Sequence, residues 1–221
     1  MLRLTELKLP LNHPPEALET LASELLGAPV LSLTVFRRGA DARRRSAILL
    51  VYTVDVQVAD EAAVLRASAG NPRIGRTPDM GYRHVARAPA HLPERPIVIG
   101  AGPCGLFAAL TLAQMGFRPI ILERGRIVRE RTKDTFAFWR KAALSPESNV
   151  QFGEGGAGTF SDGKLWSGIK APAHLGRRVL EEFVKAGAPA EILVAAKPHI
   201  GTFRLVSVVE SLRATIEALG G

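Results

Sequence analysis

The sequence predicts an α/β protein in which a small α+β domain precedes a β-α-β unit. Two observations carry this prediction. Short segments in the first part of the chain alternate apolar and polar residues, which is typical of half-buried strands. Later, the apolar residues 97–99 are followed by a glycine-rich turn, a helix-like run and a second apolar triplet at 120–122. A strand, a crossover helix and a second strand in that order predict a parallel pair.

Composition narrows the class of protein. Of the 221 residues, 47% are hydrophobic and 23% are charged, which is ordinary for a globular protein. No apolar run approaches the roughly 20 residues that a membrane helix needs, and the first residues lack the apolar segment of a secretory signal. The single cysteine excludes an internal disulfide. We therefore expect a cytoplasmic protein with no membrane partner.

The net charge of +8 is the feature that suggests a nucleic-acid partner. We do not expect one, because an arginine-rich composition and an anionic small ligand explain a positive field equally well. The densest basic segment is residues 37–45, between two expected strands. It is either a site for an anion or partner or a solvated connection, and we favour the connection.

Residues 1–70 are expected to form the small α+β domain. Alternation over residues 2–9 predicts a strand that slips phase near Thr5 and Glu6, as a β-bulge would cause. Pro14 and Pro15 suit the start of a helix that stops at Gly27. The remaining expected elements are strands at 31–35 and 48–58 and a short helix capped by Asp60 and ending at Gly70.

Residues 71–95 are expected to be a linker, since four Xaa-Pro steps and several glycines disfavour helix there. Residues 96–221 then form the third segment. Its expected elements include the β-α-β unit and a final helix with the apolar stripe Leu205, Val209, Leu212, Ile216 and Leu219.

The turn after residues 97–99 has glycines at three spaced positions. Gly100 permits the sharp turn, Gly102 lets a phosphate approach the backbone, and Gly105 lets the helix pack closely on the strand. Glu123 ends the second strand, eighteen positions after Gly105, near the spacing of an acid that holds a ribose. This combination predicts a dinucleotide site whose pyrophosphate rests on the helix N-terminus.

Two further features bear on this site. Cys104 lies at the helix start, where a thiol can have a lowered pKa, but we favour a small packing residue over a redox thiol. Residues 151–165 mix glycines with Thr, Ser, Asp and Lys. Such a run suits backbone N–H groups that line a concave surface for an anion or the polar edge of a ring. A flexible glycine loop is the alternative.

At these residues the resemblance to a family becomes specific. GAGPCGLFAALTLA, ILERG, ERTKD, SNVQFGEGGAGTFSDGKL and AKPHIGT resemble bacterial FAD-dependent dehydrogenases of poorly known substrate, within the glutathione-reductase-like flavoproteins. The resemblance is close over residues 97–219 and loose over 1–90. It implies a Rossmann-like FAD-binding βαβ core, and it makes residues 96–221 the N-terminal part of an FAD/NAD(P)-binding domain.

The resemblance also implies which residues bind the cofactor. The first motif would hold the ADP half of FAD, and the second would lie against the pyrophosphate and flavin, with Lys164 adding a positive charge. The implicated residues are Gly100, Gly102, Pro103, Cys104, Gly105, Glu123 and Arg124 for ADP, and Gly155, Gly156, Gly158, Thr159, Phe160, Ser161, Asp162 and Lys164 nearer the flavin.

Chains of this family are more than twice as long, with a later substrate domain and a second FAD motif. We therefore expect the N-terminal part of such an enzyme, with an incomplete sheet. A truncated gene and a C-terminal half supplied in trans are the two alternatives for the rest of the enzyme. The activity implied is hydride transfer through flavin N5, with NAD(P)H as a candidate donor and an unknown small-molecule substrate. No catalytic residue is assigned. His199 is the best guess for a side chain facing the flavin, although a structural role is more typical.

A second hypothesis stays open beside the enzyme. In it the chain is a truncated, catalytically inactive binding or assembly module, whose N-terminal domain binds a partner or RNA through Arg37, Arg38 and residues 43–45. A Rossmann enzyme that uses nicotinamide alone is disfavoured, because such a fold does not need the second glycine run.

Overall fold

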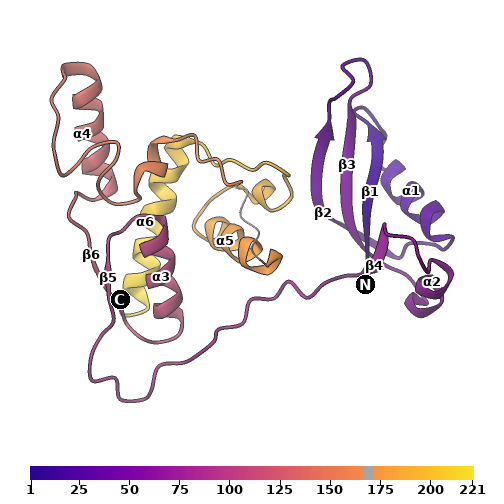
Figure 1. The fold of residues 1–221 in the computed structure, drawn as a ribbon, viewed down its shortest axis with the longest axis horizontal. Helices are drawn as coiled ribbons and strands as arrows, with labels where there is room; N and C mark the ends of the chain where they lie inside the picture. Colours follow the sequence, from indigo (N-terminus) through magenta and orange to yellow (C-terminus); the bar gives the residue numbers. More distant parts are fainter. Residues whose placement is uncertain (167–171) are drawn as a thin grey trace. The chain divides into compact units, whose positions relative to one another are not determined.

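The computed structural model describes residues 1–166 and 172–221, which divide into two compact units (Figure 1). Unit 1 comprises Met1–Met80 together with Ala190–Pro198. Unit 2 comprises Gly81–Pro189 and His199–Gly221. Unit 1 is built on an antiparallel sheet and unit 2 contains a small parallel one, so the expected mixed α/β class is confirmed.

Unit 1 is a four-stranded antiparallel sheet in the order β2-β3-β1-β4. The strands are β1 (Leu2–Pro10), β2 (Ser32–Asp41), β3 (Leu49–Gln57) and β4 (Ile74–Arg76). The pairing of β1 with β3 shifts register between Leu4 and Leu7, and Glu6 between them has φ of 59°. The expected bulge is therefore confirmed, with Glu6 in the left-handed region.

Two helices pack against this sheet and enclose the core of unit 1 (Figure 1). Helix α1 (Ala17–Leu26) ends at Gly27, whose φ of 63° forms the expected left-handed stop. Helix α2 (Glu61–Ala67) starts at Asp60, whose Oδ1 accepts a hydrogen bond from Ala63 N at 2.8 Å, as expected of a cap. The core consists of Leu2, Leu4, Leu7, Leu18, Ala22, Leu26, Tyr52, Val54, Val56, Val58 and Val64.

Three details of unit 1 differ from the sequence expectations. Residues 37–41 belong to β2, so the connection between β2 and β3 is shorter than expected. Strand β4 lies inside the segment expected to be a linker. Residues 194–196, far along the chain, pair with β2. Arg38 N donates to Val194 O at 2.7 Å, and Ala196 N donates to Arg38 O at 2.9 Å.

Unit 2 contains the β-α-β unit that the sequence predicts. Strands β5 (Ile97–Ile99) and β6 (Ile120–Leu122) are parallel, and helix α3 (Pro103–Gln114) connects them. Val98 and Ile121 are half-buried, whereas the other face of this two-stranded sheet is exposed and entirely apolar. That face consists of Ile97, Ile99, Ile120 and Leu122, with Ile99 86% exposed.

The other elements of unit 2 follow β6. They are α4 (Val128–Lys141), the 3-10 turn η1 (Ala157–Phe160), α5 (Ala173–Lys185) and α6 (Thr202–Ala218), while η2 (Ala190–Leu193) belongs to unit 1. Helices α3 and α6 lie side by side and share a core (Figure 1). Leu219, expected in the stripe of α6, follows the helix end and is exposed. No helix among the described residues combines the length and apolar character needed to cross a membrane.

Candidate functional site

The site predicted from the first glycine run lies where β5 turns into α3. Gly100 has φ of 94°, and its N–H donates to Leu122 O on the neighbouring strand at 2.7 Å. A Cβ on Gly105 would lie 1.9 Å from Gly100 O. No side chain fits at that distance, so the turn and the start of α3 require glycine at position 105.

Gly102 differs from its two neighbours in the motif. Its φ and ψ of −72° and −179° are open to any residue, and the nearest atom to an added Cβ is Gly156 Cα at 3.9 Å. That is an ordinary van der Waals distance. The fold by itself therefore does not need glycine at this position, the residue that directly precedes α3.

Glu123 reaches back from the end of β6 to the same turn. Its Oε2 accepts from Ala101 N at 2.7 Å, and its Oε1 accepts from Gly125 N at 2.8 Å. A carboxylate has about four acceptor positions, so each oxygen retains a further lone pair. The structure thus brings the predicted acid beside the first glycine run, in contact with backbone N–H groups.

The other residues predicted for the ADP half are on the surface. Pro103 occupies the first turn of α3, and the Cys104 thiol beside it is exposed. Arg124 forms an ion pair with Glu147, and its guanidinium carbon lies 5.2 Å from the centre of the Phe152 ring. Its charge is therefore balanced by a surface acid.

The second glycine run meets the first at the N-terminus of α3. Gly155 N donates to Ala101 O at 2.8 Å, and a Cβ on Gly156 would lie 2.9 Å from Pro103 Cδ. Backbone N–H groups of the run are nevertheless used inside the protein, because those of Glu154, Gly155, Gly156, Thr159 and Ser161 donate to backbone carbonyls. The run folds as a turn that leads into the 3-10 segment η1.

Two cavities flank the first turn of α3, and Leu106 lines both. One, of about 540 Å³, has both apolar and charged residues in its lining, the latter including Glu123, Glu154 and Arg213. The other, of about 440 Å³, is largely apolar. The predicted residues divide between them, since the second cavity contains Pro103, Gly155, Gly158, Thr159, Ser161 and Lys164.

The end of the second run pairs with the start of α6. Ile200 N donates to Gly163 O at 3.1 Å, and Gly201 N donates to Asp162 O at 2.9 Å. This pairing sets Lys164 opposite His199, and both side chains are exposed. His199 does not line either of the two cavities described above.

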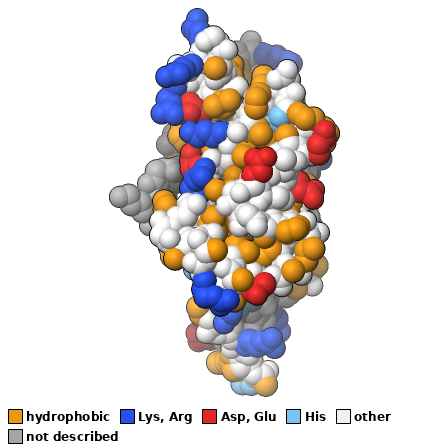
Figure 2. Space-filling view, turned by 90° about the vertical axis from the view of Figure 1, so that its right-hand side faces the viewer, with side chains coloured by type: hydrophobic (Ala, Val, Ile, Leu, Met, Phe, Trp, Pro, Cys, Tyr) orange, Lys and Arg blue, Asp and Glu red, His pale blue; other side chains and the backbone are white. Residues whose placement is uncertain are grey.

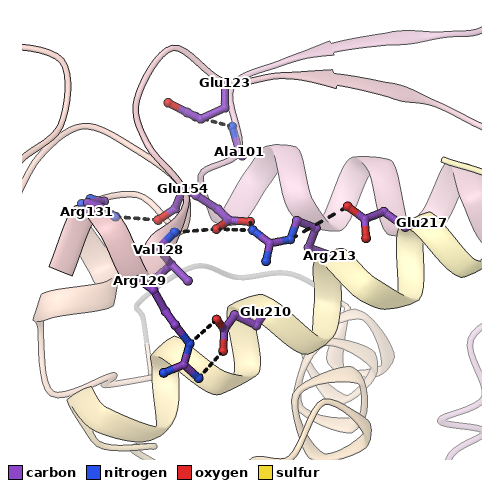
Figure 3. A network of polar contacts seen from close by, with 9 residues as sticks. All are labelled: Ala101, Glu123, Val128, Arg129, Arg131, Glu154, Glu210, Arg213 and Glu217. Carbon is purple, nitrogen blue, oxygen red and sulfur yellow. Dashed lines mark hydrogen bonds and ion pairs between the residues drawn. The ribbon is translucent and has the colours of Figure 1, made fainter. Parts of the chain in front are cut away.

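Two charged residues that the sequence patterns did not reveal organise this region (Figure 3). Arg131 on α4 is fully buried, and burial lowers the pKa of its guanidinium, an effect that Glu123 and Glu154 oppose. Glu154 is 4% exposed, accepts from Val128 N at 2.6 Å and pairs with Arg213 Nη1 at 2.9 Å. The available signal was helical spacing, because positions 128, 131 and 135 form the buried stripe of α4.

The basic segment of unit 1 is exposed, as Arg37, Arg38 and residues 43–45 show. Figure 2 shows unit 1 from one side, with Lys and Arg side chains gathered toward its upper end among acidic and apolar groups. Arg43 is paired, since its Nε donates to Asp41 Oδ1 at 2.8 Å. The described residues contain no cluster of side chains suited to hold a metal ion.

Comparisons with known proteins add three similarities. Residues 1–57 match a family described as a domain of unknown function, DUF8436. An uncharacterized protein of Clostridium beijerinckii is 43% identical over 189 residues, which are 86% of this chain and 35% of that protein. Bacilliredoxin reductase Bdr of Bacillus subtilis is 49% identical over 35 residues, 16% of this chain and 11% of that protein. The chain spans about a third of the length of its Clostridium relative.

Proposed function

We propose that this chain is the FAD-binding part of an FAD-dependent oxidoreductase, with the cofactor pyrophosphate at the N-terminus of α3. The observation that carries the proposal is Gly102. Neither its backbone angles nor its neighbours require glycine, yet it lies between the Glu123 carboxylate and the second glycine run. A bound group that approaches the backbone closely supplies the missing reason.

The residues around Gly102 fit the parts of FAD. The first N–H groups of an α-helix have no partner within the helix and favour an anion. The remaining lone pairs of Glu123 are suited to ribose hydroxyls. The apolar cavity of about 440 Å³, with exposed Lys164 at its lining, suits a planar ring with a polar edge.

Bound flavin would supply the redox chemistry by accepting a hydride at N5, with NAD(P)H as the proposed donor. The chain itself would bind and orient the cofactor, and we assign no acid or base. The short similarity to a protein named bacilliredoxin reductase supports a redox role. The Clostridium relative is much longer than this chain, which supports the proposal that the substrate site lies in other polypeptide.

The test compares three glycine-to-alanine variants of the full chain. Gly102→Ala should leave the free energy of unfolding within about 1 kcal/mol of wild type, because its Cβ meets nothing closer than 3.9 Å. Its affinity for FAD should fall at least about tenfold, a loss of about 1.4 kcal/mol. Gly105→Ala should instead destabilise by about 2 kcal/mol or more, since its Cβ would collide with Gly100 O.

Gly176→Ala is the matched control, because Gly176 lies on the exposed surface of α5 with open space around it. It should leave FAD affinity unchanged and raise the free energy of unfolding by up to about 1 kcal/mol, because alanine favours helix over glycine. FAD binding is measured by flavin fluorescence titration, and stability by urea unfolding. A wild-type chain that retains no FAD, or a Gly102→Ala variant that binds as tightly as wild type, would contradict the proposal.

A further inference from the structure

Arg131 is unusual because it is a fully buried arginine whose hydrogen bonds all end on uncharged oxygens. Its Nε donates to Asn149 O at 2.8 Å, and its Nη2 donates to Val150 O at 2.8 Å. Its Nη1 donates to Glu154 O at 2.7 Å and to Gly156 O at 2.8 Å. Burying a charge is costly unless its donors are satisfied, so this arrangement is highly specified.

The four carbonyls belong to one loop, residues 149–156, and they lie at both of its ends. The guanidinium fork therefore joins the start of the loop to its finish. The loop is shaped around the side chain, because a Cβ on Gly153 would lie 2.6 Å from Arg131 Cδ. No helix or strand runs through residues 149–156, so the loop has no regular hydrogen-bond ladder of its own to fix its path.

The C-terminal end of this loop contacts the candidate site. Gly155 donates to Ala101 O, and Gly156 packs against Gly102 and Pro103 at the start of α3. Arg131 bonds the carbonyls on either side of that contact, at Glu154 and Gly156. A movement of the loop away from Arg131 would therefore open the space in front of Gly102.

Glu154 ties the same loop to two helices (Figure 3). Its side chain accepts from Val128 N, the first residue of α4, and pairs with Arg213 on α6. Since its main-chain carbonyl also accepts from Arg131, the loop is held from both its backbone and a side chain.

We propose that Arg131 is a positioning residue for the dinucleotide site: its guanidinium holds the 149–156 loop closed and keeps Gly155 and Gly156 at the N-terminus of α3. The expected effect on cofactor binding rests on the proposed FAD site, whereas the hold of Arg131 on the loop does not. A lysine is a poor substitute, because its single ammonium cannot reproduce the planar fork that reaches four carbonyls.

The test uses Arg131→Met, Arg131→Lys and the matched control Arg129→Met in the full chain. Arg129 lies two residues away on the same helix, but it is exposed and pairs with Glu210 at 2.6 Å. Hydrogen exchange is measured without ligand, and FAD affinity is measured on protein shown by circular dichroism to be fully folded. A role in overall stability alone would lower the unfolding midpoint without changing that affinity.

Both Arg131 variants should speed amide exchange within residues 149–159 at least about tenfold, while β5 and β6 stay protected. Their FAD affinity should fall by at least about tenfold. A third variant, Arg131→Ala, leaves room for added methylguanidinium, which should restore part of the FAD affinity that this variant loses. Arg129→Met should change neither exchange nor FAD affinity. Arg131→Lys should lose as much loop protection and FAD affinity as Arg131→Met, because a positive charge without the planar guanidinium cannot reach the four carbonyls.

Several outcomes would overturn the inference. If amide exchange in residues 149–159 is the same in the Arg131 variants as in wild type, Arg131 does not hold the loop. If exchange is faster but FAD affinity is unchanged, Arg131 holds the loop without positioning it for the cofactor. Loss of structure throughout unit 2 in both variants would show that Arg131 supports the whole unit rather than the loop. A wild-type chain that binds no FAD contradicts the proposed function instead, and the exchange measurement still decides the tether.

Discussion

Among single residues, Asp41 at the end of β2 has a pKa that its neighbour Arg43 lowers strongly. The hydrogen bond from the Arg43 side chain lowers the pKa of Asp41 from 3.8 to about 2. A carboxyl with a depressed native pKa adds stability at pH values above its unfolded pKa. That contribution is lost as the pH falls toward the native value. The stabilisation by Arg43 is therefore complete above about pH 4 and absent below about pH 2.

We predict that the Asp41 side chain titrates with a midpoint near pH 2 and that Arg43→Gln moves this midpoint toward 3.8. Carboxyl chemical shifts followed by NMR across an acid titration measure both values. Arg45→Gln, which removes a nearby charge of the same segment, serves as the control and should leave the midpoint in place. An Asp41 midpoint that is the same with and without Arg43 would show that the contact is absent in solution.

The glycines of the first motif show how far sequence reasoning extends at this scale. Spacing alone assigned close packing to Gly105, and the contact with Gly100 O agrees. Spacing could not show that Gly102 is free of such a constraint. Arg131 was missed for a physical reason: charged helical residues are normally solvated, and the carbonyls that bury this one come from a loop about twenty positions later.

Among the secondary-structure elements, those that depend on neighbouring residues in the sequence could be predicted from helix caps and from the alternation of apolar and polar residues. The stop at Gly27 and the cap at Asp60 follow from side-chain and backbone chemistry within a few residues. The ends of strands were harder to predict from the sequence, because pairing with the neighbouring strand determines where a strand ends. Residues 37–41 are polar or small, yet pairing with β3 extends β2 through them. Strand β4 has three residues, too few for alternation to reveal.

Two ion pairs of different burial end on α6: the exposed Arg129–Glu210 pair comes from α4, and the Glu154–Arg213 pair comes from the 149–156 loop, which makes the two a controlled comparison. Glu154→Ala should destabilise the chain by about 1–3 kcal/mol, because it leaves Val128 N and the partly buried Arg213 without their acceptor. Glu210→Ala removes the exposed pair with Arg129 and should cost no more than about 1 kcal/mol.

Urea unfolding of the two variants measures this difference. Equal losses of stability would show that burial of Glu154 does not matter in solution. The comparison also separates the tie between helices from cofactor binding, since it is made without FAD.

At the scale of the whole molecule, the β5–β6 sheet is unusual because one of its faces is apolar and exposed. Parallel strands are ordinarily covered on both faces, yet Ile99 is 86% exposed and Ile97 is 61% exposed. An exposed apolar face of this kind is typical of a surface that contacts other polypeptide.

We predict that Ile99→Ser reduces the binding of an apolar dye such as ANS while changing the free energy of unfolding by no more than about 1 kcal/mol. Val98→Ser is the matched control on the other face, where the side chain packs beneath α3. It should lower stability more and leave dye binding from the native state unchanged. Strong destabilisation by Ile99→Ser would mean that this face is already covered in solution.

The assignment of residues 190–198 to unit 1 has a consequence for the connectivity of the chain. Since both flanking segments belong to unit 2, the polypeptide passes between the units three times, after residues 80, 189 and 198. A single proteolytic cut after residue 80 would therefore not liberate unit 1. The amino-terminal fragment would remain associated through the pairing of Arg38 with residues 194 and 196, and the nicked protein would behave as a complemented pair of fragments.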